Sequence, residues 1–288
     1  DESFTRRAAA AFIASSSSPP ALDCSVASSV AAAVTAVRER FIESVRIRSR
    51  SDVPLAYCLS GGVDSNAIIS VATKVLGLET HGFTIMNSDK RYEEEDLIKT
   101  SVEKLGIDHT EIHLDKSDFL ENMSKIIQHR KQPISTISYY VHWLLMRSMN
   151  SAGFKVSFSG TAADELFSGY YDHHNLYLSS IAADASNFKK EKTAWLQNTG
   201  KFVRNPFLQN PELFIKDPKF RDHIYLDNHL FASFLNINWM EIFQETNYLD
   251  DNMRNRMMNE MFEEAVPIIL KEDDMNAMYF SIENRSPF

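Results

Sequence analysis

Cysteine is scarce in this sequence, with two residues, Cys24 and Cys58, in 288. Two cysteines do not make a disulfide framework, so the fold must rest on a hydrophobic core. An apolar fraction of 44% in a chain of this length is enough for such a core. Cys58 lies in an apolar run, and we expect it to be a small buried hydrophobic residue.

Positive charge and long apolar runs are also lacking. The formal net charge is −9, which disfavours a nucleic-acid-binding surface. No apolar run is long enough to cross a bilayer. We therefore expect neither nucleic acid nor a membrane as a partner. We also expect a cytoplasmic location. An anionic ligand would need local positive charge from a metal, a lysine or a helix N-terminus.

A phosphate loop of the Walker type is missing as well. The stretch LAYCLSGGVDSNAII has a glycine turn, Ser60-Gly61-Gly62-Val63-Asp64-Ser65, but no lysine followed by Ser or Thr after the second glycine. Glycines let a ligand approach the backbone, and free N–H groups at a helix N-terminus favour anions. Asp64 is a suitable magnesium ligand. The plain alternative is a strand–helix turn with Asp64 as the helix cap.

Strand and helix patterns alternate through the first part of the chain. Apolar runs predict strands at 55–59, 81–86, 109–114 and 155–160. Between and around them, helical spacing predicts helices at 26–45, 65–76, 93–105, 118–129 and 139–150, and another from about 164. This alternation predicts an α/β fold with a doubly wound parallel sheet. From about residue 177 the pattern indicates a mostly helical region.

Two polar turns follow strands of this sheet, at 60–65 and 159–164. Ligands of such sheets bind beyond the carboxyl ends of the strands, so we expect both turns to face one crevice. His109 and His113 alternate as in a strand, which argues against a helical metal pair. His173 and His174 follow the second turn, and we expect them at its rim. Residues 1–25, with the run SSSSPP, are expected to be a linker, and 26–288 the main domain.

Four ordered motifs resemble one enzyme family. SGGVDS resembles the signature turn of the PP-loop ATP pyrophosphatases, and SDVPLAYCLSGGVDS resembles the entry to the synthetase domain of glutamine-dependent asparagine synthetases. HGFTIM, SGTAADELFSGYY and ENRSPF resemble three further motifs of that family, in order. The resemblance implies a PP-loop ATP pyrophosphatase fold.

The resemblance also implies a role for each matching residue. The turn residues Ser60, Gly61, Gly62, Asp64 and Ser65 would hold the pyrophosphate end of ATP. Adenine would contact backbone groups of Cys58, Leu59, Ile85, Ser159 and Gly160. Asp64 and Asp164 would hold Mg²⁺, and Lys271 would stabilise charge as pyrophosphate leaves and ammonia attacks.

The implied reaction is that of an AMP-forming amide ligase. An aspartate side-chain carboxylate would be adenylated by ATP, and ammonia from glutamine would then displace AMP to give asparagine. A glutaminase domain is expected to precede this sequence in a longer protein, and further helices to follow its last residue. A homodimer is possible.

Two positions of the second loop depart from the family pattern. This loop of asparagine synthetases usually reads S-G-E-G-x-D-E, and here it reads SGTAADE, with Ala162 in place of the second glycine and Thr161 in place of the glutamate. That position belongs to the catalytic set, because the glutamate is tied to handling the acyl-adenylate and the nucleophile. Two alternatives stay open: an amidotransferase or lactam-forming synthetase acting on another carboxylate, and an inactive nucleotide-binding remnant.

Overall fold

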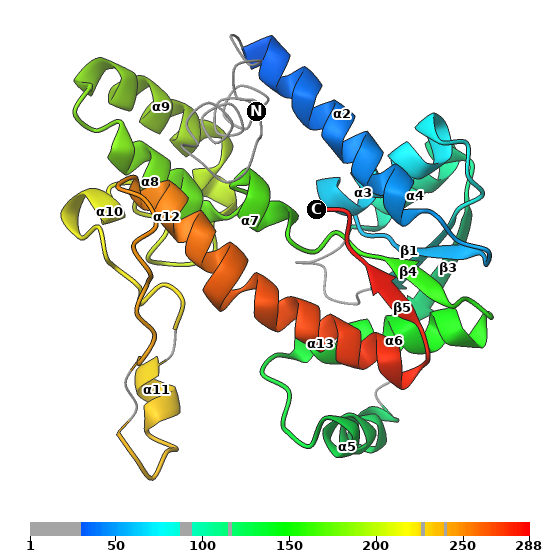
Figure 1. Cartoon of the computed structure of the whole chain (residues 1–288). Helices are drawn as coiled ribbons and strands as arrows, with labels where there is room; N and C mark the ends of the chain where they lie inside the picture. Colours follow the sequence, from blue (N-terminus) through cyan, green and yellow to red (C-terminus); the bar gives the residue numbers. More distant parts are fainter. Residues whose placement is uncertain (1–29, 87–93, 115–116, 226–227, 239–240) are drawn as a thin grey trace. The chain divides into compact units, whose positions relative to one another are not determined.

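The computed structural model describes residues 30–86, 94–114, 117–225, 228–238 and 241–288 (Figure 1). The expected linker at 1–25 lies outside the described residues. The described chain divides into two compact units. One comprises Val34–Ala163 and Val266–Phe288, and we call it the sheet unit. The other comprises Asp164–Ala265 with the described residues up to Ala33, and we call it the helical unit.

The sheet unit is built on parallel strands. The strands are β1 (Leu55–Cys58), β2 (His81–Met86), β3 (Asp108–His113), β4 (Val156–Phe158) and β5 (Glu283–Arg285). Their order is β3-β2-β1-β4-β5, and every neighbouring pair is parallel. Tyr57 of β1 lies opposite Gly82 of β2 on one side and Phe158 of β4 on the other. The first four strands confirm the α/β prediction, whereas β5 was not expected.

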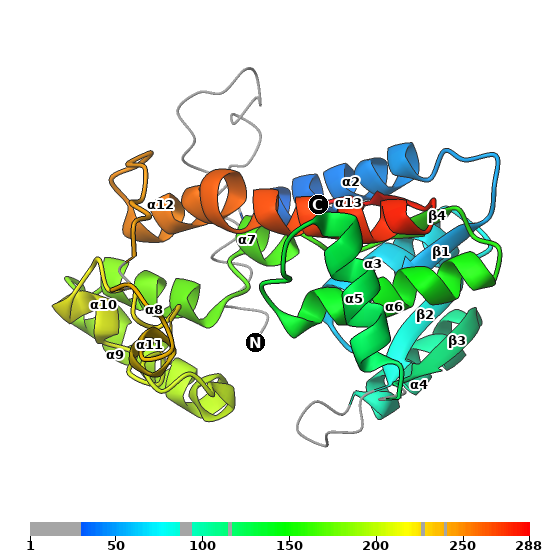
Figure 2. The same ribbon diagram turned by 90° about the horizontal axis from the view of Figure 1, so that it is seen from below.

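The strand order reverses at β1. The chain runs outward from β1 through β2 to β3, and then returns to place β4 on the other side of β1. One face of the sheet is covered by α2 (Val30–Arg48), α3 (Val63–Ser70) with its π-helical continuation Val71–Val75, and α4 (Glu95–Leu105). The other face carries α6 (Ile137–Ser151) and α13 (Val266–Tyr279), and α5 (Phe119–Arg130) packs against both (Figures 1 and 2). The sheet is therefore doubly wound.

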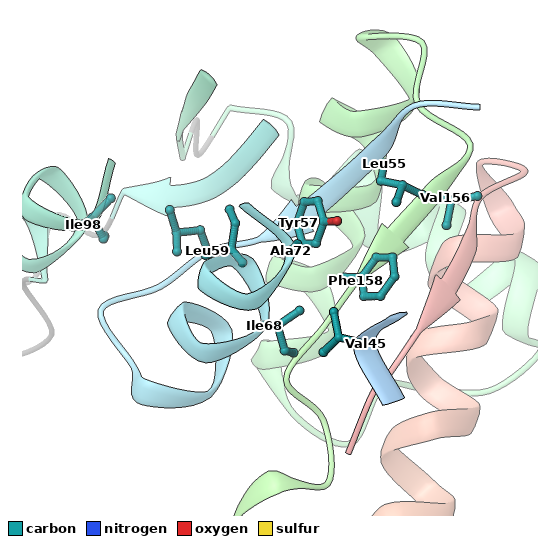
Figure 3. Close-up of a cluster of buried hydrophobic side chains, with 10 residues drawn as sticks. Val45, Leu55, Tyr57, Leu59, Ile68, Ala72, Ile98, Val156 and Phe158 are labelled. Carbon is teal, nitrogen blue, oxygen red and sulfur yellow. The ribbon is translucent and has the colours of Figure 1, made fainter. Parts of the chain in front are cut away.

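The alternation of side chains along β1 divides the core between the two faces. Leu55 and Tyr57 pack with Phe158 and with Ile68 of α3 (Figure 3). Ala56, between them, faces α6 and α13. The rings of Tyr57 and Phe158 stack with their centroids 5.0 Å apart. Burial of each such side chain stabilises the fold by about 1.5–3 kcal/mol, so the strands that end at the two polar turns are firmly fixed.

The short strand β5 closes the sheet through contacts with α2. The Arg285 guanidinium donates to the carbonyl oxygens of Arg48 and Arg50, at 2.6 and 2.9 Å. These carbonyls lie at the end of α2, where main-chain oxygens lack helical partners. The Phe288 ring stacks on Phe41 of α2, with centroids 4.8 Å apart. The ENRSPF segment is thereby fixed beside β4.

The helical unit confirms the mostly helical region predicted from about residue 177. Its elements are α7 (Ala163–Phe167, which begins at the last residue of the sheet unit's first segment), α8 (Tyr171–Ser180), α9 (Ala185–Asn198), the 3₁₀ turn Gly200–Phe202, α10 (Leu213–Lys216), α11 (Asn228–Ala232), α12 (Asn252–Asn259) and the π-helical turn Glu260–Glu264. Leu178, Trp195 and Met257 lie in its core. Across the described parts of both units, we find no helix long and apolar enough to cross a membrane.

Candidate functional site

A cavity of about 330 Å³ lies at the carboxyl ends of the central strands, within the sheet unit. This is the point where strand order reverses between β1 and β4, which is where open α/β sheets bind ligands. The cavity is lined by Cys58, Leu59, Ser60, Gly62, Asp64, Ser65, Thr84, Ile85, Glu94, Val141, Leu145 and Gly160. The turn after β1 and Gly160 after β4 therefore share one crevice, as expected.

The glycine turn is held by hydrogen bonds to the first turn of α3. The Ser60 N–H donates to Ser65 Oγ at 3.1 Å, and the Gly62 N–H donates to Ser60 Oγ at 3.1 Å. Asn66 Nδ2 donates to the carbonyl oxygens of Ser60 and Gly62, at 2.8 and 2.7 Å. The N-cap residue of α3 is Gly62, which has no side chain to cap the helix. A helix N-terminus with this geometry attracts anions.

An acidic side chain of the protein itself already occupies part of this turn. The Gly61 N–H donates to Glu94 Oε2 at 2.7 Å, and Glu94 also lines the cavity. The turn therefore accepts an anionic oxygen in its present geometry. Glu94 was missed in the sequence because it lies just before α4 and 33 residues beyond Gly61, where no motif marks it.

The wall formed by β1 and β2 is fixed by buried hydrogen bonds. Thr84 Oγ1 donates to the Leu59 carbonyl oxygen at 2.7 Å, and the Leu59 N–H donates to the Phe83 carbonyl oxygen at 2.9 Å. His109 Nε2 lies 2.9 Å from Thr84 Oγ1, and burial lowers the pKa of this imidazole. Burial, with a smaller effect of the Asp273 charge, raises the pKa of the Cys58 thiol to about 12. Cys58 is thus an uncharged wall residue and not a nucleophile.

Two of the predicted nucleotide-binding residues, Gly61 and Ser159, do not line the cavity. Gly61 instead bonds to Glu94, and Ser159 Oγ accepts a hydrogen bond from Asn284 Nδ2 at 3.2 Å. Asp64 lines the cavity, whereas Asp164 belongs to the helical unit. The Asp64–Asp164 magnesium pair therefore stays a prediction.

Thr161 and Lys271 are placed very differently. Thr161 Oγ1 donates to Asp273 Oδ2 of α13 at 3.0 Å, and Asp273 is 6% exposed. Lys271 lies two residues earlier on the same helix, roughly 200° around its axis. It is exposed and makes no hydrogen bond or ion pair with any residue in the described ranges. Its catalytic role stays a prediction, and Asp273 is a residue to which the sequence analysis assigned no role.

A buried cation also lies near this part of α13. The Arg130 guanidinium forms an ion pair with the Glu272 carboxylate and donates to Asn276 Oδ1 at 2.7 Å. Asn276 Nδ2 donates in turn to the Tyr139 carbonyl oxygen at 2.8 Å. These contacts lock α5, α6 and α13 together, so the face of α13 that carries Asp273 has a fixed position.

The helical unit contains a second cluster of buried charges. His173 Nε2 lies 2.6 Å from Glu260 Oε2, and Arg256 Nε lies 2.9 Å from Glu260 Oε1. Asp172 is 3.5 Å from Arg256 Nε and 3.3 Å from His223 Nε2. The prediction that His173 lies at a rim is wrong, because this side chain is 1% exposed and is held by an acid 87 residues away.

This second cluster has the residue types of a metal site, but an arginine already neutralises its carboxylates. Ligand atoms of Asp172, His173 and Glu260 lie within 4.8 Å of one another. However, the Arg256 guanidinium already contacts both carboxylates. A buried cation at this position neutralises the acids and would repel a metal ion. We interpret the cluster as a structural ion network.

Comparison with known proteins agrees with the motifs. The family model for asparagine synthase matches residues 36–288. Glutamine-hydrolyzing asparagine synthetase 1 of Bacillus subtilis is 31% identical over 137 residues, which are 48% of this chain and 21% of that protein. A putative asparagine synthetase of Methanocaldococcus jannaschii is 32% identical over 136 residues, 47% of this chain and 26% of that protein.

A differently named relative matches a similar share of this chain at lower identity. The amidase chyE of Penicillium rubens is 27% identical over 151 residues, 48% of this chain and 22% of that protein. The matched segments span about a quarter or less of the length of each of these three relatives. The family model nevertheless covers most of this sequence, including the glycine turn, SGTAADE and ENRSPF. The chain belongs to the asparagine synthase family.

Proposed function

We propose that this chain is the synthetase part of an AMP-forming amide ligase. It adenylates the side-chain carboxylate of aspartate with ATP, and ammonia then displaces AMP to give asparagine. The observation that carries the proposal is the cavity at the ends of β1 and β4, which is lined by the glycine turn and Gly160. Membership of the asparagine synthase family supports the same reaction.

The cavity is suited to a nucleotide. Its volume of about 330 Å³ is typical of small-molecule sites. Cys58, Leu59 and Ile85 give an apolar wall for adenine, and the turn 60–65 offers amides and hydroxyls to the phosphates. The hydrogen bond from Gly61 to Glu94 supports anion binding at this turn.

The donor set is also suited to Mg²⁺. Asp64 and the hydroxyls of Ser60 and Ser65 present hard oxygen atoms at the cavity, and Mg²⁺ prefers such ligands. Asp164 would complete the site from the acidic turn. When bound, the ion supplies charge stabilisation on the phosphate oxygens. The protein's own contribution is to position the carboxylate opposite the α-phosphorus and to hold it there.

The full-length protein is proposed to carry a glutaminase domain that supplies ammonia, to act in the cytoplasm and to form a homodimer. Lys271 is proposed to stabilise negative charge in the transition states. Because Lys271 is exposed in this structure, its role requires the substrates to approach the exposed side of α13.

A second candidate keeps the adenylating chemistry and changes the acceptor. Thr161 is neutral, and an amidase is among the relatives. In this version, the enzyme amidates a different carboxylate or closes a lactam. A panel of carboxylates in ATP–pyrophosphate exchange separates the two, because a strong preference for aspartate excludes the second candidate.

The products of ATP cleavage test the proposed function. With ATP, Mg²⁺, aspartate and ammonium chloride, we expect AMP and pyrophosphate to be released in equal amounts. Asp64→Asn should reduce this release by about 100-fold or more if Asp64 holds the ion. Release of ADP and phosphate would contradict the proposal and favour another reaction, and equal activity in Asp64→Asn would contradict the role of Asp64. Absence of any ATP cleavage would favour an inactive remnant.

A further inference from the structure

Thr161 occupies a fixed position beside the cavity. It directly follows Gly160, a cavity residue, and its carbonyl oxygen accepts a hydrogen bond from Ser286 Oγ at 2.5 Å. Ser159 Oγ lies 3.2 Å from Thr161 Oγ1. The next residue, Ala162, has a φ of 77°, a conformation that costs a non-glycine residue energy and is retained only where the surroundings impose it.

The Thr161 hydroxyl contacts a buried carboxylate. Thr161 Oγ1 donates to Asp273 Oδ2 at 3.0 Å, and Asp273 Oδ1 lies 3.5 Å from His142 Nδ1. Burial lowers the pKa of His142, so this imidazole is neutral and does not neutralise Asp273. The Asp273 charge also acts on the buried guanidinium of Arg130, on α5, but this guanidinium makes its hydrogen bonds to Glu272 and Asn276.

The Asp273 carboxylate is also close enough to the cavity wall for its charge to act there. Its negative charge contributes to the raised pKa of the Cys58 thiol, and Cys58 lines the cavity. A buried carboxylate that accepts from a hydroxyl can take a proton through that hydroxyl. Thr161 follows the cavity residue Gly160 in the chain, and its hydroxyl contacts Asp273, so it lies between this carboxylate and the end of the cavity at Gly160.

We propose that Thr161 and Asp273 form a proton relay for the attack of ammonia on the acyl-adenylate. This inference rests on the proposed function. Thr161 is the catalytic residue that contacts the nucleophile, and Asp273 is a positioning and proton-accepting residue that acts through it.

The atoms balance as follows. The nitrogen lone pair forms the new C–N bond, and the C–O bond to AMP breaks with its electron pair remaining on the AMP oxygen. One of the three ammonia protons passes to Thr161 Oγ1 while the Thr161 hydroxyl proton passes to Asp273 Oδ2. The products are the amide, AMP and a protonated Asp273, which later releases its proton to water.

The two half-reactions distinguish this relay from a structural role. ATP–pyrophosphate exchange without a nitrogen source measures adenylation, and amide formation with ammonium chloride measures the second step. We expect Thr161→Val and Asp273→Asn to keep exchange within about threefold and to lose about 100-fold or more in amide formation. The double variant should lose little more than either single variant, because the two residues act as one unit.

Controls keep the outcome interpretable if a variant folds poorly. Thr161→Ser restores a hydroxyl and should recover amide formation to within about tenfold of the natural chain. Asp274→Asn changes an exposed acid that follows Asp273 on α13, and should alter neither step. Equal losses in both half-reactions, or full amide formation in Thr161→Val, would overturn the relay. Absence of exchange in the unaltered protein with every carboxylate would instead overturn the proposed function.

Discussion

Replacement of Gly160 by alanine is a local test of the candidate site. A Cβ at this position would lie 3.1 Å from Asp64 Cβ and 3.4 Å from the Ser65 backbone nitrogen. Asp64 and Ser65 belong to the first turn of α3, so neither atom is the flexible end of a long side chain. The added methyl must therefore push the glycine turn away from the end of β4 by a few tenths of an ångström.

The size of the effect follows from the cost of overpacking. Inserting a methyl into a fixed contact typically costs about 1–3 kcal/mol, which corresponds to an affinity loss of roughly 5- to 150-fold. Calorimetric titration of Gly160→Ala with ATP and Mg²⁺ measures this loss. Gly77→Ala is the matched control, since a Cβ there meets nothing within 4 Å and its φ of 66° affects stability alone. Unchanged ATP affinity in Gly160→Ala would refute the placement of the phosphates at this turn.

Three further predictions concern buried groups. Arg256→Leu should lower the free energy of unfolding by about 3–5 kcal/mol, because it removes the buried guanidinium that contacts the carboxylates of Asp172 and Glu260. Urea unfolding checks this, and Arg46→Leu, at an exposed pair with Glu43, should change little. Burial lowers the pKa of His173, but the Glu260 carboxylate outweighs burial, and the net pKa is raised above 6.5. The stabilisation from protonated His173 is therefore fully present below pH 6.5 and is lost as pH rises through the raised pKa. Urea unfolding between pH about 6 and about 9 should show this loss, and His173→Asn should reduce it. Cys58 is half-buried, and the pKa of its thiol is raised to about 12. At neutral pH it should therefore react with iodoacetamide far more slowly in the folded chain than in urea, as measured by mass spectrometry, and equal rates would contradict the raised pKa.

The elements that local patterns define were predictable. The strands at β1 to β4 follow from apolar runs, and the turn at Ser60 to Ser65 follows from its glycines, because both signals lie within a few residues. The strand β5 was not predictable in this way. Its ENR sequence is polar and short, and it becomes a strand because Val156 of β4 pairs with Glu283.

Residues recruited over long distances were also missed. Asp273 reaches Thr161 across 112 positions, and Arg130 reaches Glu272 across 142. No periodicity or motif near Asp273 or Arg130 indicates which residue it contacts. Lys271 shows the converse: it is close to Asp273 in sequence, but the helical turn places the two on different sides of α13.

The central claim is that a carboxylate attacks the α-phosphorus of ATP. It is tested most directly with aspartate labelled with ¹⁸O in its side-chain carboxylate, ATP, Mg²⁺ and ammonium chloride. If the carboxylate is adenylated and ammonia displaces AMP, mass spectrometry will find one ¹⁸O in each AMP and one in each asparagine. Unlabelled AMP, or ¹⁸O in inorganic phosphate beside ADP, would contradict the account.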